Sequence, residues 1–79
     1  MHEAKVAQYA FDIIKEATPK HVTKITFGVG KPNTVMRDSF EMYFLGLIKG
    51  SALEKAELIY EDSNEEGFFV FSIEVDDGN

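Results

Sequence analysis

The chain begins with three residues, Met1-His2-Glu3, whose groups could form a metal chelate. The α-amine, the His2 amide and the His2 imidazole lie within a few bonds of one another, so they can form fused rings around one ion. Planar nitrogen ligation of this kind suits Ni²⁺ or Cu²⁺. Glu3 would orient the site or supply an outer carboxylate. The alternative is a solvated terminus in which Glu3 only favours the first turn of a helix.

We expect the chelating amine to persist in the cell. Removal of the initiator methionine requires a small second residue, and His2 is not small. Whether these three residues form a metal site or occur together by chance depends on the evidence from the rest of the sequence.

The bulk composition predicts one small folded domain over residues 1–79. A hydrophobic content of 44% and an aromatic content of 13% are sufficient for a packed core. The net charge of −6, with eight Lys and Arg residues, argues against nucleic acid or an anionic membrane as a partner. No apolar run approaches the roughly 18 residues that span a bilayer. We expect a cytoplasmic protein.

The chain contains no cysteine. Disulfides, a thiolate nucleophile and cysteine-ligated zinc are therefore excluded. If the chain has a metal site, its ligands must be nitrogen or oxygen atoms.

Hydrophobic periodicity predicts two amphipathic helices, at residues 3–17 and at about 35–49. Asn33 or Thr34 is the expected N-cap of the second helix, after a turn at 30–33, and Gly50 is its expected left-handed end. The apolar stripe of the first helix is Val6, Ala10, Ile13, Ile14 and Ala17, and that of the second is Met36, Phe40, Phe44, Leu47 and Ile48.

Alternating apolar residues predict three strands, at 23–29, 57–61 and 69–75. The order is helix, strand, helix, strand, strand, so we predict an α+β fold with a three-stranded sheet and both helices on one face. The second helix would be the crossover between the first two strands. The last two strands would form an antiparallel hairpin around the polar turn 62–67. Apolar residues on both sides of Phe69 indicate a central position for the third strand.

Several short motifs follow one another in a defined order along the chain. After Met1-His2-Glu3 come Val29-Gly30, then Asp38-Ser39-Phe40, then Lys49-Gly50-Ser51, and finally Ile73-Glu74-Val75. With this layout, the chain resembles the hydrogenase nickel-incorporation protein family, HypA, over essentially its whole length.

The resemblance implies a HypA nickel-domain fold in which Met1, His2 and Glu3 form the metal site and Ni²⁺ is transient cargo. It implies an accessory protein and not an enzyme. The partners it implies are a nickel-handling GTPase or the large subunit of hydrogenase.

The chain departs from the family between its second and last strands. There the family inserts a zinc-binding domain with two Cys-x-x-Cys pairs, whereas this chain has only the turn 62–67. An insertion of this kind can be removed without breaking the sheet, because the strands reconnect through a short loop. We therefore expect a short form without the zinc domain and without bound zinc.

Other polar and aromatic residues have simpler interpretations. His21 could complete a ligand set within one chain or across a dimer, but a surface position at a strand entry explains it better. The acidic residues of 57–66 lack EF-hand spacing and are expected at a solvated end of the sheet. The aromatic set most simply belongs to the core; its members are Phe40, Phe44, Phe69 and Phe71.

Two functions remain open from the sequence. The first is a nickel metallochaperone, or the remnant of one, that releases Ni²⁺ from Met1-His2-Glu3 to a partner. The second is a metal-independent interaction module that kept the fold and docks on a partner or forms a homodimer through an exposed sheet edge.

Overall fold

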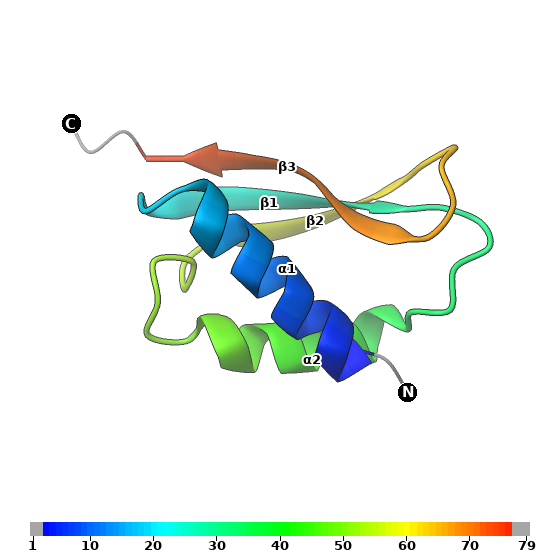
Figure 1. Ribbon diagram of the computed structural model, residues 1–79, viewed down its shortest axis with the longest axis horizontal. Helices are drawn as coiled ribbons and strands as arrows, with labels where there is room; N and C mark the ends of the chain where they lie inside the picture. The colour runs from blue at the N-terminus through cyan, green and yellow to red at the C-terminus, as the bar shows by residue number, and fades with distance from the viewer. Residues whose placement is uncertain (1–2, 77–79) are drawn as a thin grey trace.

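The computed structural model describes residues 3–76; the predictions for residues 1–2 and for the tail 77–79 fall outside that range. Its elements, in chain order, are α1 (Glu3–Ala17), β1 (Val22–Val29), α2 (Arg37–Ile48), β2 (Glu57–Asp62) and β3 (Phe68–Val75). Both helices lie on the same side of the sheet (Figure 1). The predicted α+β class and element order are confirmed. Neither helix is long and apolar enough to cross a membrane.

The sheet has the order β2-β1-β3, with β1 in the centre. β1 pairs in parallel with β2, where Ile25 is opposite Leu58, and antiparallel with β3, where Ile25 is opposite Ile73. α2 is therefore the crossover between the two parallel strands, as predicted. The predicted hairpin between the last two strands is wrong, and so is the central position of β3.

Gly30 permits the connection that places β2 and β3 on opposite sides of β1. The connection from β2 to β3 crosses the end of β1, where the Ser63 amide donates to the Val29 carbonyl at 2.9 Å and the Gly30 amide donates to the Gly67 carbonyl at 2.7 Å. A Cβ atom on Gly30 would overlap the backbone carbonyl of Glu65. The missing side chain thus allows the crossing.

The aromatic pair at the start of β3 covers both faces of β1. The Phe68 ring stacks on the Phe27 ring at 5.4 Å on the side of the helices. Successive side chains of a strand point to opposite faces. Phe69 accordingly lies against Gly28, where an added Cβ atom would overlap its ring. β3 is therefore apolar on both faces although it is an edge strand, because Phe69 covers Gly28 of β1.

The core lies between β1 and the two helices, and its largest fully buried side chains are Phe27, Phe40, Phe44, Ile14, Ile25, Ile48 and Leu53. Four predicted apolar positions are wrong because they are exposed: Met36 (66%), Phe71 (65%), Ile13 (39%) and Ala17. Met36 precedes the first turn of α2, and Phe71 has no opposite residue in β1. The end of α2 is as predicted, because Gly50 adopts a φ of 80°.

We expect Gly30→Ala to destabilise the fold by about 2–3 kcal/mol, because the new methyl group must displace backbone and not a flexible side chain. Gly46→Ala is the matched control. Gly46 lies inside α2 with no atom within 4 Å of an added Cβ, so this change should stabilise the helix by about 0.5–1 kcal/mol. Urea unfolding followed by circular dichroism measures both. Equal effects of the two substitutions would contradict the role of Gly30.

Candidate metal centre

The predicted ligand group lies at the start of α1, and the structure describes one of its three members. Met1 and His2 lie outside the described residues, whereas Glu3 is the first residue of α1. The Glu3 residue is only 5% exposed, although it stands in the first turn of a surface helix. A carboxylate at such a position must have polar partners.

Glu3 binds the start of the second helix. Its Oε2 accepts a hydrogen bond from the Met36 amide at 2.9 Å. Met36 is the N-cap of α2, where the residue's own side chain makes no capping bond. A negative charge is favourable beside the exposed amides and the positive dipole end of a helix. The carboxylate of α1 therefore supplies the partner that α2 lacks locally.

This contact replaces the predicted N-cap. The Asn33 side chain is used in a local turn, in which its Oδ1 accepts from the Val35 amide at 3.0 Å and its Nδ2 donates to the Val35 carbonyl at 3.1 Å. Asn33 therefore cannot cap α2, which begins at Arg37 and not at 35. Neither Asn33 nor Thr34 is the N-cap.

The environment of Glu3 favours its charged form. The pKa of the Glu3 carboxyl is lowered from 4.5 to about 2, and the causes in order of size are the α-amino group of the chain, the Met36 amide and the Glu3 amide. Burial acts in the opposite direction and is outweighed. Glu3 is an anion at every physiological pH, with a carboxylate that already serves in the joint between α1 and α2.

A second polar cluster follows on the first turns of α2. The Tyr60 hydroxyl of β2 donates to the Glu41 carboxylate at 2.7 Å, and the Arg37 guanidinium lies 4.0 Å from the centre of the Tyr60 ring. Burial, followed by the bond to Glu41, raises the pKa of the Tyr60 hydroxyl. The phenol is thus protonated at neutral pH and is not an anionic metal ligand. It ties β2 to α2.

His21 lies at the far end of α1 from Glu3. A helix of 15 residues is roughly 22 Å long, and His21 stands between the end of α1 and the start of β1. One chain therefore does not bring His21 to Glu3. Within residues 3–76, no group of three or more His, Cys, Asp or Glu side chains could hold a metal ion.

Sequence reasoning did not find the bond between Glu3 and Met36, because 33 positions separate them. No local signal connects the two. From the sequence, Glu3 was expected to interact favourably only with the first turn of its own helix. In the tertiary structure it binds the start of α2 instead.

We predict that Glu3→Gln lowers stability at neutral pH, because it removes a charge that the folded state favours. A depressed pKa contributes stability above the ordinary value of 4.5, and this contribution is lost as the pH falls toward 2. The unfolding free energies of wild type and variant should therefore differ at pH 7 and approach each other as the pH falls from about 4.5 toward 2. Glu16→Gln, at an exposed glutamate near the end of α1, is the control. A constant difference across this range would contradict the assignment.

Two comparisons with known proteins bear on this architecture. The profile of the family described as "Hydrogenase/urease nickel incorporation, metallochaperone, hypA" matches residues 1–68. The fold is similar to the solution structure of the Ni metallochaperone HypA from Helicobacter pylori, with a TM-score of 0.69 over 100% of this chain and 90% of that chain. The sequence identity is 16%, so this likeness supports the fold alone. No curated protein matches the chain.

The family match extends from Met1 through α1, β1, α2 and β2 to the first residue of β3. It therefore includes the amino-terminal tripeptide and both helices that Glu3 connects. The chain belongs to the HypA family of metallochaperones, which act in nickel incorporation for hydrogenase and urease.

Proposed function

We propose that this chain binds Ni²⁺ at its amino terminus and delivers the ion during maturation of a nickel enzyme. The ligands would be the α-amine, the His2 amide nitrogen and the His2 imidazole, a set that suits planar Ni²⁺. The observation that carries the proposal is the family match, which includes Met1, His2 and Glu3. The chain would act as a carrier and not as a catalyst.

Glu3 has a positioning role in this proposal. Its carboxylate accepts a hydrogen bond from the Met36 amide, which supports an orienting role more than direct ligation. By linking α1 to the start of α2, Glu3 would hold the ligands that precede it near one point on the surface. Mutation of a residue that orients the ligands of a metal site commonly lowers the affinity for the metal 10- to 100-fold.

A terminal site suits transfer of the ion. Incoming ligands from a partner can replace the outgoing nitrogen atoms one at a time, without opening a buried cage. The partners we propose are a nickel-handling GTPase or the large subunit of hydrogenase, and the family description adds the maturation of urease. The nitrogen ligands must lose protons to bind Ni²⁺, so affinity should fall as the pH decreases.

We also propose that the chain forms a single domain without the family's zinc-binding insertion. The connection between β2 and β3 spans only residues 63–67, and the chain contains no cysteine. The hydrogen bonds donated by the Ser63 and Gly30 amides close this connection over the end of β1.

A chelator should therefore leave the melting temperature unchanged. Structural zinc contributes folding free energy, so a protein that depends on it unfolds when the ion is removed. Thermal unfolding before and after EDTA treatment tests this expectation, with metal content measured by mass spectrometry. Stoichiometric zinc together with a lower melting temperature after EDTA would contradict it.

The nickel site is tested by titrating untagged protein with Ni²⁺ and following heat release and the absorption band of planar Ni²⁺. We expect one ion per chain, and loss of tight binding in both His2→Ala and a variant extended by one residue at the amino terminus. His21→Ala is the matched control because it removes the other imidazole of the chain, and it should bind like wild type.

Two results would contradict the site. One is equal binding by wild type, His2→Ala and the extended protein, and the other is absence of binding in wild type. Circular dichroism of each variant separates loss of ligands from loss of the fold. Glu3→Ala should give an intermediate affinity if Glu3 positions the ligands, and the wild-type affinity if it does not.

A further inference from the structure

The sheet has one face that no helix of residues 3–76 covers. Ile25 and Phe27 of β1 belong to the buried core, on the side where both helices lie (Figure 1). Side chains alternate along a strand, so Lys24, Thr26 and Gly28 point to the other side. We call this side the outer face; it also includes the residues of β2 and β3 that lie opposite these three positions.

The β3 half of the outer face is apolar. Phe69 lies opposite Gly28 and covers it. Phe71 follows Val70, which is opposite the buried Phe27, so Phe71 also points to the outer face. There it is 65% exposed. A large aromatic side chain therefore stands in water on a face that has no covering layer.

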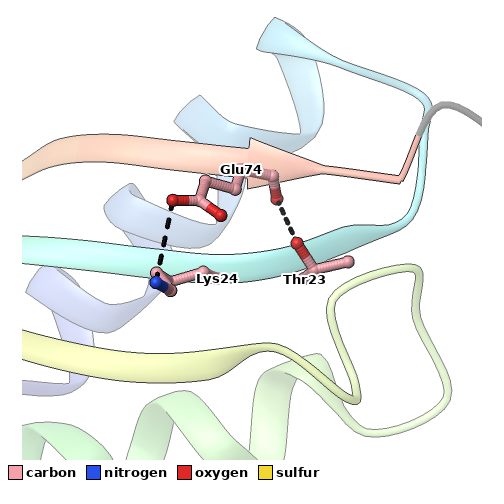
Figure 2. Close-up of polar contacts among 3 residues, drawn as sticks. All are labelled: Thr23, Lys24 and Glu74. Atoms are coloured by element: carbon pink, nitrogen blue, oxygen red, sulfur yellow. Dashed lines mark hydrogen bonds and ion pairs between the residues drawn. The ribbon is translucent and has the colours of Figure 1, made fainter.

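The β2 half of the outer face is acidic. It carries Glu57 and Glu61, both exposed, with the half-buried Ile59 between them. Lys24 is the only Lys or Arg in the three strands of residues 3–76, and it forms an ion pair with Glu74 at 3.7 Å (Figure 2). Its charge is thus balanced by β3, and Glu57 and Glu61 leave the β2 half negative.

Charge is also divided along the chain. All eight Lys and Arg residues precede β2, so the segment from β2 to the end of β3 contains acidic charges alone. This segment supplies both strands that flank β1, and the net charge of −6 arises from it. The exposed carboxylates of residues 57–76 are those of Glu57, Glu61, Asp62, Glu65, Glu66, Glu74 and Asp76.

We propose that the outer face binds a basic amphipathic helix of another protein. The apolar stripe of that helix covers Phe69, Phe71 and Ile59, and Lys or Arg side chains along one flank lie over Glu57 and Glu61. A helix packs on a sheet through one apolar stripe, and this face lacks such a layer. The acidic half of the face determines the sign of the partner's charge and the orientation of its helix.

The same charges disfavour other occupants. A second copy of the chain would bring acidic strands together, and nucleic acid or an anionic membrane would be repelled. Within residues 3–76 no group of three or more His, Cys, Asp or Glu side chains could hold a metal ion, so these carboxylates are not a metal site. The inference goes beyond the proposed nickel function, because the outer face lies across the sheet from the joint between Glu3 and α2.

The probe is a synthetic peptide of about 14 residues, with leucine at helical spacing and lysine at the other positions. Two comparison peptides replace every lysine by glutamate or scramble the order so that the stripe is lost. Fluorescence anisotropy of each labelled peptide with untagged protein gives the dissociation constant at low and high salt. We expect saturable one-to-one binding of the leucine–lysine peptide alone, weaker at high salt.

The apolar half is tested by Phe71→Ser, which should raise the dissociation constant about tenfold because the peptide loses its most exposed contact. Met42→Ser is the matched control. Met42 is 63% exposed on α2, on the other side of the sheet, so the dissociation constant should stay at the wild-type value.

The acidic half is tested by combining Glu57→Gln with Glu61→Gln, which should raise the dissociation constant about fivefold at low salt and less at high salt. The control combines Asp12→Asn with Glu16→Gln on α1. It removes the same charge from the chain, so it separates contact with the outer face from the effect of net charge, and its dissociation constant should stay near that of wild type.

Amide chemical shifts locate the peptide independently, and their changes should centre on Thr26, Ile59 and Phe71. The proposal is overturned by absence of binding up to about 1 mM, by equal binding of the leucine–glutamate peptide, by equal effects of a variant and its control, or by shifts centred on α1 or α2. Peptide affinity that falls as the protein concentration rises would assign the face to a second copy and also overturn it. Nickel binding by Phe71→Ser and wild type is measured separately, so failure of the proposed metal site leaves this test intact.

Discussion

The ring of Phe27 contacts aromatic side chains from α2, β2 and β3 at once. Its centre lies 5.0 Å from that of Phe40, 5.4 Å from those of Tyr60 and Phe68, and 5.5 Å from that of Phe44. A domain of this size has room for one such centre, and burial of a phenylalanine contributes on the order of 2–3 kcal/mol. This packing joins the central strand β1 to α2 and to both neighbouring strands.

The candidate metal centre depends on this packing indirectly, through the contact between the two helices. α1 and α2 lie side by side on the sheet (Figure 1), and the bond from the Met36 amide to Glu3 joins their amino-terminal ends. One carboxylate thus completes the start of α2 and holds the start of α1. A single side chain thus links the amino-terminal ends of both helices.

The two edges of the sheet differ in their chemistry although both belong to one small sheet. β2 carries acidic side chains and is tied to α2 by the bond between Tyr60 and Glu41. β3 is longer, almost uncharged and beside an apolar groove. The two edges of this sheet therefore differ in charge and in the neighbours that cover them.

Much of the architecture could be predicted from local patterns. The 3.6-residue period located both helices, the alternation located the strands, and Gly50 marked the end of α2, because these signals arise from the backbone and from burial on one face. The strand order could not be predicted. Phe68 and Val70 show that β3 is apolar on both sides, but only the packed fold reveals Phe69 over Gly28 at an edge.

The sequence by itself determined which donor groups the proposed site Met1-His2-Glu3 could offer, the absence of cysteine and the family motifs, since these depend on residue identity and short spacing. Only the tertiary structure decided that Glu3 binds the Met36 amide, that His21 lies at the other end of α1 and that β3 is an open edge. Contacts across many residues depend on how the chain crosses Gly30 and packs around Phe27, and no local pattern encodes that path.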